Sequence, residues 1–480
     1  MSVDTRTRSQ INLILDNLPG AAAHPAPDRW DEVDDVEFLY RKDTVLCREQ
    51  HADRVVEAIR RVIDEAGYGE APASAEESEG GEEAESDAHP IRREQVSGTR
   101  AVVSLTLPPS GILVPALLDR LDPELGRGTA TPDHILYVSP KPCPADEPEE
   151  VPPGTTDPVP PPGLNARGGR PCRGVYQPEC DGHGVVVSIV DTGLIPDADV
   201  GHPWLAGVQG APEDPYTVDS SGQTIIAPYA GHGTFVAGVA RCMAPKASVY
   251  VERAFDIAGA NYETMLPASL EDALDRNPDI LVFTFCATSR LDLSLLTFDD
   301  FYETRIRFMK GLVVLSPAGN DGQSQLNWPA AYREVLSVGA LSANWRDRAH
   351  FSNFGKWVDV YAPGQDLINA FPAGTYVCTE PPIGQHREFH GMAKWSGTSF
   401  STPVVAGLIA ARMSATGENA QQAADSLLRL ACRQTIPGVG AALYPGQACD
   451  DGDDTGCGCG CRGHGPRGRC DCGRDRPGAR

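Results

Sequence analysis

The chain has 480 residues, which is enough for two or three domains and one large hydrophobic core. Its formal net charge of −25 at pH 7 argues against nucleic acids and anionic membrane surfaces as partners. No stretch has the apolar run that a membrane-spanning helix needs, and residues 11–16 are too short and too polar for the core of a signal peptide. The sequence therefore predicts a cytoplasmic protein.

The cysteines agree with a reducing compartment. Eight of the 14 are scattered without the close pairing of a disulfide framework: Cys47, Cys143, Cys172, Cys180, Cys242, Cys286, Cys378 and Cys432. Cys172 and Cys180 are near enough in sequence to pair around a short loop, and that alternative stays open.

The first 140 residues predict a small α+β domain behind a loosely ordered N-terminus. Residues 1–35 are polar and rich in proline and alanine, without hydrophobic periodicity. Between residues 36 and 140, strand patterns and helix patterns alternate around an acidic loop at residues 70–90. The expected strands cover residues 36–40, 44–47, 100–107 and 134–138, and the expected helices cover residues 55–63 and 114–121.

Two further segments flank the rest of the chain. Residues 141–175 are rich in proline and acidic residues, so they predict a stiff, exposed linker in which a protease could cut its own chain. Residues 446–480 are rich in cysteine, glycine and arginine, and this composition predicts a flexible tail. Its Cys-x-Cys spacing differs from the Cys-x-x-Cys of zinc sites. Metal capture or thiol chemistry and a disordered tail both remain open there, and we predict no metal site.

Residues 176–445 alternate strand and helix patterns, which predicts an α/β domain with a doubly wound, mostly parallel sheet. Near its end, Gly397-Thr398-Ser399 precedes a long run of small and apolar residues. This pattern is typical of a turn that leads into a buried helix, and it places Ser399 at a helix N-terminus, which favours nearby negative charge.

Three upstream motifs could supply partners for that serine. Asp191 follows a buried β-branched strand, His232 begins a second helix of small residues, and Asn320 follows another buried strand. Taken singly, each fits a structural role: a capping serine, a turn aspartate, a core histidine and a turn asparagine. Together they supply a nucleophile, a base, a group that orients the base and an amide donor.

The order of Asp191, His232, Asn320 and Ser399, each in its own glycine-containing motif, resembles the subtilisin-like serine peptidases (subtilases) over residues 176–432. The resemblance implies a subtilisin-like fold and peptide hydrolysis through an acyl-enzyme. His232 would be the general base, Asp191 would orient it, and Asn320 would donate to the oxyanion. No cofactor is implied. Many relatives bind calcium, but no EF-hand pattern occurs here, so calcium is not predicted.

Two extended segments are expected to bind the substrate backbone by strand addition. They contribute the predicted substrate-binding residues Thr284, Phe285, Cys286, Pro317, Ala318 and Gly319. The family commonly has glycine at the position of Cys286, so its side chain should narrow the pocket. Phe235 stands where relatives often have another histidine, and it should pack inward without disturbing the chemistry.

The expected partners are polypeptide substrates, and a monomer is expected. By resemblance, the N-terminal domain would dock on the peptidase domain as chaperone and inhibitor, and a permanent docking domain is the alternative. Two other functions remain open. One is a catalytically silent peptide-binding module, and the other is a peptidase gated by a metal- or redox-responsive tail.

Overall fold

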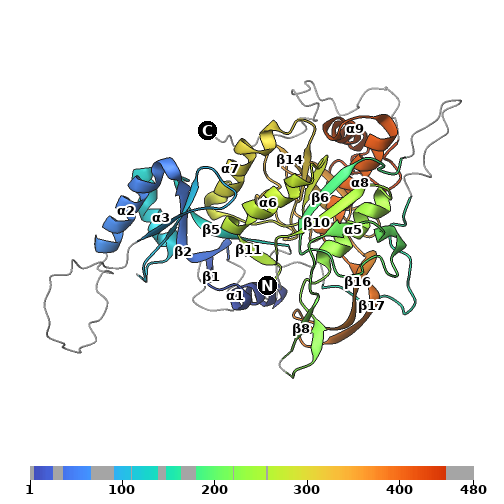
Figure 1. Ribbon diagram of the computed structural model, residues 1–480, viewed down its shortest axis with the longest axis horizontal. Coiled ribbons are helices and arrows are strands. Elements are labelled where there is room, and N and C mark those ends of the chain that lie inside the picture. Colours follow the sequence, from blue (N-terminus) through green and yellow to red (C-terminus); the bar gives the residue numbers. More distant parts are fainter. Residues whose placement is uncertain are drawn as a thin grey trace.

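The computed structural model describes residues 5–24, 36–65, 91–109, 111–138, 147–163, 180–219, 221–255 and 258–449. They form an N-terminal unit (residues up to 138) and a C-terminal unit (residues 180–449), which lie side by side (Figure 1). A connecting segment (residues 147–163) follows the N-terminal unit. The predicted acidic loop, Cys143, Cys172 and the tail from residue 450 onward lie outside the described residues.

The centre of the C-terminal unit is a seven-stranded parallel sheet in the order β15-β14-β13-β12-β6-β10-β7. Along β6, Val187 and Ile189 face one hydrophobic core and Val190 faces another, so apolar residues are needed at nearly every position. The strands are β6 (Val186–Asp191), β7 (Gln209–Gly210), β10 (Ser248–Arg253), β12 (Ile280–Phe283), β13 (Val313–Pro317), β14 (Val335–Leu341) and β15 (Val360–Pro363).

Helices cover both faces of this sheet, which confirms the predicted doubly wound architecture (Figure 1). Helices α5 (His232–Met243), α8 (Thr398–Thr416) and α9 (Ala420–Arg433) share one core with the sheet. Helices α6 (Leu266–Asp275) and α7 (Leu296–Thr304) share the other. Short 3₁₀ turns complete the connections: η2 (Glu49–His51), η3 (Pro203–Leu205), η4 (Glu263–Met265), η5 (Arg290–Asp292) and η6 (Ile306–Phe308).

The N-terminal unit is an antiparallel sheet with two helices, α2 (Ala52–Glu65) and α3 (Val114–Leu125), packed on one face. Its strands are β1 (Ala21–His24), β2 (Phe38–Arg48), β3 (Arg92–Gln95), β4 (Val102–Thr106) and β5 (Ala130–Tyr137). The two strands predicted at residues 36–40 and 44–47 form one long strand. β11 (Ala260–Tyr262) of the C-terminal unit pairs with β5, so one sheet extends across both units.

The prediction of a loosely ordered N-terminus was wrong for residues 5–24. Helix α1 (Thr5–Asn17) precedes β1, and Ile11 and Ile14 are buried beside β5 and Cys286. The Gln10 side chain also donates a hydrogen bond to Glu380. A short helix with few apolar residues is stabilised mainly by tertiary packing, so its own sequence carries only a weak signal.

A second sheet of the C-terminal unit, in the order β17-β16-β9-β8, was not predicted from the sequence. It contains β8 (Tyr216–Val218), β9 (Thr224–Ile226), β16 (Leu367–Val377) and β17 (His386–Trp395). The connecting segment binds to its long hairpin, because Glu149 pairs with Lys394 and Val159 pairs with Ile368. Residues 147–163 are therefore docked along part of their length and do not form the free linker that the sequence predicted.

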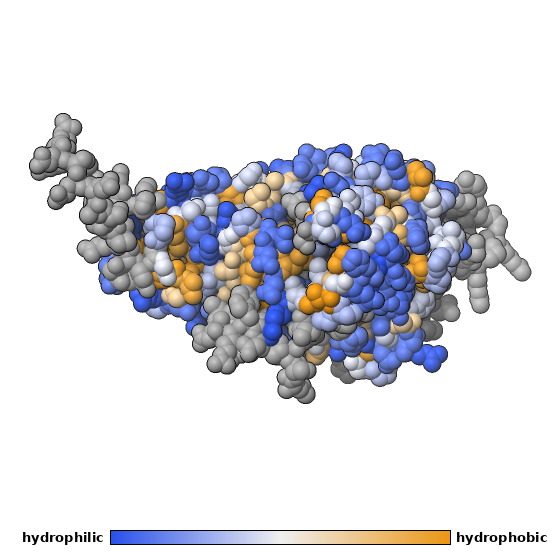
Figure 2. Space-filling model, turned by 90° about the horizontal axis from the view of Figure 1, so that it is seen from below, coloured by the Kyte–Doolittle hydropathy of each residue, from blue (hydrophilic) through white to orange (hydrophobic). Residues whose placement is uncertain are grey.

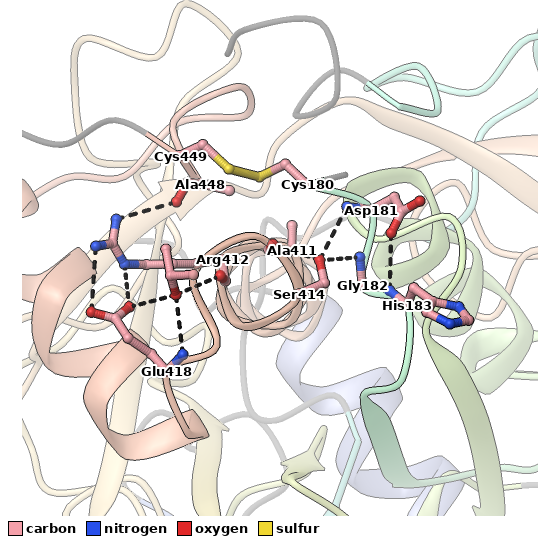
Figure 3. Close-up of a disulfide and its surroundings, with 11 residues drawn as sticks. Cys180, Asp181, Gly182, His183, Ala411, Arg412, Ser414, Glu418, Ala448 and Cys449 are labelled. Atoms are coloured by element: carbon pink, nitrogen blue, oxygen red, sulfur yellow. Dashed lines mark hydrogen bonds and ion pairs between the residues drawn. A yellow bond between two sulfur atoms is a disulfide. The ribbon is translucent and has the colours of Figure 1, made fainter. Parts of the chain in front are cut away.

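A disulfide joins Cys180 to Cys449 across 269 positions of the chain (Figure 3). It connects the segment that leads into β6 with the segment that follows α9. Beside it, Ser414 at the end of α8 accepts a hydrogen bond from the backbone N–H of Gly182 at 2.9 Å. Disulfides persist in oxidising compartments, so this bond disagrees with the reducing compartment predicted from cysteine spacing.

The surface mixes polar and apolar side chains. In Figure 2, hydrophobic patches interrupt a largely hydrophilic face of an elongated molecule. The most exposed large apolar side chains include Val200 and Val218. Among the helices of the described residues, none has the length and apolar character required to span a bilayer.

Candidate active site

Asp191 lies at the carboxyl end of β6 and is completely buried. Its Oδ1 accepts a hydrogen bond from the backbone N–H of Thr192 at 2.6 Å. Both carboxylate oxygens lie within hydrogen-bond distance of His232 Nδ1, at 2.8 and 2.9 Å. A carboxylate can only accept here, so Nδ1 carries the ring proton and Nε2 is left as an acceptor.

His232 is the first residue of α5, and its position depends on two glycines. Gly231 has φ 79°, and a Cβ there would lie 2.4 Å from Cδ of Pro372. A Cβ on Gly233 would lie 2.4 Å from the carbonyl oxygen of Gly193. The Gly-His-Gly sequence therefore lets α5 begin in close contact with the turn after Asp191.

Aromatic rings enclose the imidazole. The Trp395 ring meets it edge-on at 5.3 Å, and the Phe400 ring lies 5.1 Å away. Phe235 is buried one turn along α5 and packs on both of these rings, at 5.9 and 4.5 Å. The prediction that Phe235 packs inward is confirmed. His232 is consequently 3% exposed, in surroundings that strengthen its interaction with Asp191.

Thr284 supports Asp191 through its side chain. Its hydroxyl donates to Asp191 Oδ2 at 2.6 Å, and its backbone carbonyl accepts a hydrogen bond from the Ser399 hydroxyl at 3.2 Å. The sequence placed Thr284 among the substrate-binding residues. In the structure, its side chain completes the hydrogen bonding of the buried carboxylate.

Ser399 lies in the first turn of α8 and lines one small cavity together with His232 and Asn320. Besides the Thr284 carbonyl, its hydroxyl has one further hydrogen-bond partner among the described residues, the carbonyl oxygen of Val138 at 3.3 Å. Tertiary folding thus brings together the three segments that carry Asp191, His232 and Ser399.

Asn320 follows β13 and is oriented by the start of α8. Its Oδ1 accepts hydrogen bonds from both the backbone N–H and the hydroxyl of Thr398, each at 2.8 Å. The Oδ1 is thereby assigned as the acceptor, and the amide NH₂ remains for the cavity. Gly319, at φ 96°, permits this turn, because a Cβ there would lie 2.2 Å from Nδ2 of Asn327.

The N-terminal unit occupies the predicted strand-addition site. Tyr137 and Cys286 exchange two backbone hydrogen bonds of 3.0 Å, and the N–H of Val138 donates to the carbonyl of Gly259 at 2.8 Å. Residues 137–138 therefore lie between the segments that contain Cys286 and Gly259. Sequence reasoning missed Val138 and Gly259, because neither stands in a recognisable motif.

The remaining predicted substrate-binding residues differ in their surroundings. The Phe285 side chain packs into the core between Phe255 and Phe283. Ala318 continues the sheet by donating to the carbonyl of Val338 at 2.8 Å, and Gly319 donates to the Thr398 hydroxyl at 3.1 Å. Pro317 is the last residue of β13 and is buried. Cys286 is also buried, and burial raises the pKa of its thiol well above the usual value.

Comparison with known proteins places this site in a family. A model described as "Subtilase family" matches residues 182–454, more than half of the chain. The chain belongs to the subtilase family. Subtilases are serine-type endopeptidases, and the matched residues contain all four motifs that the sequence singled out.

Named relatives of this subtilase are proteases. This chain is 30% identical to thermitase of Thermoactinomyces vulgaris over 253 residues. The aligned region covers 50% of this chain and 78% of thermitase. This chain is 31% identical over 249 residues to an intracellular serine protease of Paenibacillus polymyxa, covering 48% of this chain and 66% of that protein. Fervidolysin of Fervidobacterium pennivorans is similar in fold, with a TM-score of 0.51 at 19% identity over 85% of this chain and 61% of that chain.

Proposed function

We propose that this subtilase is a serine endopeptidase that cleaves polypeptides held as an added strand along residues 284–286. The observation that carries the proposal is the position of the chain's own residues 137–138. They lie in an extended conformation along Cys286 and present the Val138 carbonyl to the Ser399 hydroxyl. A cleft that binds one polypeptide backbone in this way can bind the backbone of a substrate.

The proposed reaction follows from the protonation of His232. Its Nδ1–H is held by Asp191, so the free Nε2 can take the proton of Ser399 when the serine oxygen attacks a carbonyl carbon. The imidazolium then passes that proton to the leaving amine, and an acyl-enzyme remains. Water attacks the acyl-enzyme with the same base, which regenerates Ser399. Asp191 stabilises the imidazolium in both halves of the reaction.

The oxyanion of each tetrahedral intermediate would be bound by the Asn320 amide and the backbone N–H of Ser399. Thr398 holds Asn320 in this orientation through two hydrogen bonds to Oδ1. The N-terminus of α8 adds its positive dipole end close to the developing charge.

The N-terminal unit would act as an intramolecular inhibitor. While Ser399 donates to the carbonyls of Val138 and Thr284, its hydroxyl proton is held by backbone oxygens. The contacts across the two units, from Tyr137–Cys286 to the β5–β11 pairing, keep this segment in the cleft. We propose that the enzyme cuts its own chain directly after Val138, in place of the cut within the linker of residues 141–175 that the sequence suggested.

The test compares the wild-type chain with the Ser399→Ala variant by intact mass and by labelling with a fluorophosphonate. We expect the wild type to lose a fragment that ends at Val138 and to become labelled at Ser399. The variant should keep its full mass and stay unlabelled. The wild-type chain can also be cut after Val138 by an added protease and separated from the fragment. If the separated chain remains unlabelled, the proposed function is contradicted.

A further inference from the structure

Glu213 is a buried carboxylic acid that the proposed mechanism does not use. Glu213 is 6% exposed and lies between β7 and β8. The backbone N–H of Glu213 donates to the carbonyl of Leu194 at 2.9 Å, and the N–H of Leu194 donates to the carbonyl of Ala211 at 2.9 Å. These bonds hold Glu213 against the turn that follows Asp191.

The Glu213 carboxylate contacts the start of the helix that carries His232. Both oxygens lie 3.1 Å from the backbone nitrogen of Gly231, the residue directly before His232. Gly231 is the N-cap of α5, so its own N–H has no partner within the helix. The acceptor for this N–H comes from another part of the chain, and Glu213 supplies it.

A second contact fixes the same turn of helix. The N–H of Gly233 donates to the Thr192 hydroxyl at 3.1 Å, so His232 lies between two anchored residues. Thr192 follows Asp191 directly, whereas Glu213 packs beside Gly193, where an added Cβ would lie 3.3 Å from the Glu213 Cβ. A shift of Gly231 would move the imidazole relative to the carboxylate of Asp191.

We propose that Glu213 is a positioning residue for His232, holding the N-terminus of α5 so that the imidazole meets Asp191. The inference rests on the proposed function and adds a residue to it. Glu213 touches no reacting atom. Its effect on catalysis would pass through Gly231 and the helix start.

The charge of Glu213 makes the inference measurable. Burial raises its pKa to about 8, the N–H of Gly231 lowers it, and the charge of Asp191 raises it. The Thr192 hydroxyl and the Arg253 guanidinium lower the pKa to a smaller extent. At neutral pH, Glu213 therefore carries its proton. Above about pH 8, a second negative charge develops beside Asp191.

The experiment uses the full chain in the Ser399→Ala background, so that it stays uncut. The probe is the far-downfield proton NMR signal of the His232 Nδ1–H, recorded from about pH 6 to about pH 10 in chain labelled with ¹⁵N-histidine. We expect this signal to shift with a transition near the pKa of Glu213. In Glu213→Gln, the signal should persist without that transition, because the amide oxygen still accepts from Gly231 but cannot ionise. In Glu213→Ala, the signal should broaden or vanish.

Glu252→Gln is the matched control, since Glu252 is also 6% exposed but pairs with Arg276 at 3.1 Å. It should behave as the wild type. A transition that persists in Glu213→Gln, or an unchanged signal in Glu213→Ala, would overturn the inference. Because this readout needs no hydrolysis, it remains decisive if the chain proves inactive and the proposed function fails.

A second readout is the rate of peptide hydrolysis by self-processed chains that keep Ser399. A misplaced base affects the transition state more than substrate binding, so Glu213→Ala should lower kcat by about 10–100-fold with little change in KM. Glu213→Gln should retain most of kcat at neutral pH and lose the pH dependence that begins near pH 8. An Ala variant with unchanged kcat would also overturn the inference.

Discussion

The Ser399 hydroxyl donates a hydrogen bond to the carbonyl oxygen of Val138, although the two residues are 261 positions apart. One is in the first turn of α8, and the other follows the last strand of the N-terminal unit. Inhibition and catalysis would therefore compete for a single hydroxyl. Each condition that loosens the N-terminal unit should expose the Ser399 hydroxyl to a labelling reagent.

Loss of the Asp191 charge should reduce catalysis most. In Asp191→Asn, the amide can no longer hold His232 with its proton on Nδ1, and the loss in kcat should be about 10⁴-fold, as in the general serine-protease triad. Thr284→Val removes the hydroxyl that donates to Asp191 at 2.6 Å and lies 3.0 Å from the Val190 carbonyl, and it should cost about tenfold. Peptide hydrolysis by the processed chain measures both. Thr375→Val, at a partly exposed threonine of β16, is the control, and an Asn variant as active as this control would refute the role of Asp191.

Asn320 should contribute only to the transition state. Asn320→Ala is expected to lower kcat by roughly 10²–10³-fold, the loss known for removal of such a side-chain donor in subtilisin. Asn320→Asp keeps an acceptor for the N–H of Thr398 but provides no amide donor. It should therefore lose similar activity while remaining more stable than the Ala variant. A fully active Asp variant would show that the amide does not bind the oxyanion.

Asp300 should help to keep the active site closed. Its carboxylate, 1% exposed on α7, accepts from the backbone N–H groups of Arg100 and Ala101 in the N-terminal unit, at 2.8 and 3.2 Å. Asp300→Ala removes the acceptor of both N–H groups, and each such hydrogen bond contributes about 0.5–1.5 kcal/mol. We expect fluorophosphonate to label Ser399 of the uncut chain several-fold faster.

Glu303→Ala provides the comparison for this variant. Glu303 also belongs to α7 and faces Arg48, but its side chain is 57% exposed, and such ion pairs contribute little. Its labelling rate should equal that of the wild type. Equal rates for the Asp300 and Glu303 variants would mean that the Asp300 contacts do not hold the N-terminal unit in place.

Asp133 should make the stability of the chain depend on pH. It is fully buried, and burial together with the charge of Glu263 raises its pKa to about 7, against smaller opposing effects of Thr264 and Arg41. Between its ordinary pKa and pH 7, the folded chain binds a proton at this site that the unfolded chain releases. The contribution to the free energy of unfolding therefore falls as pH rises through this interval and is constant above it.

Asp133→Asn cannot titrate, so this contribution should disappear. The free energy of unfolding of the wild type and of the variant is measured by denaturant at about pH 5 and about pH 8. The difference between the two proteins should not be the same at the two pH values. Asp43→Asn, at a side chain that is 48% exposed, should show no such change. If the difference in unfolding free energy between the wild type and Asp133→Asn is independent of pH, the raised pKa of Asp133 is contradicted.

The disulfide should stabilise the C-terminal unit. Replacing both Cys180 and Cys449 by Ser should lower the free energy of unfolding by about 2–5 kcal/mol, because the bond closes a long loop. Denaturant unfolding measures this loss. Cys432→Ser, at a partly exposed cysteine without a disulfide, should have little effect. If reductant destabilised the wild type no more than the double variant, the two cysteines would not be joined in solution.

The amino-acid sequence by itself determined the central sheet and the order of the proposed catalytic residues. Buried strands such as β6 need apolar residues on both faces, and the start of α5 needs glycine for close contact, so these features leave a local pattern. The side chains of Asp191, His232, Asn320 and Ser399 were identified because each stands in such a pattern.

Tertiary structure alone decided what those residues contact. Four features join segments that are distant in the chain. They are the hydrogen bond from Ser399 to Val138, the hydrogen bond from Thr284 to Asp191, the disulfide of Cys180 with Cys449 and the packing of α1. The free energy of such contacts arises only when both partners are brought together and shielded from water. Neither partner alone therefore needs a distinctive sequence, and the connections become visible only in the folded chain.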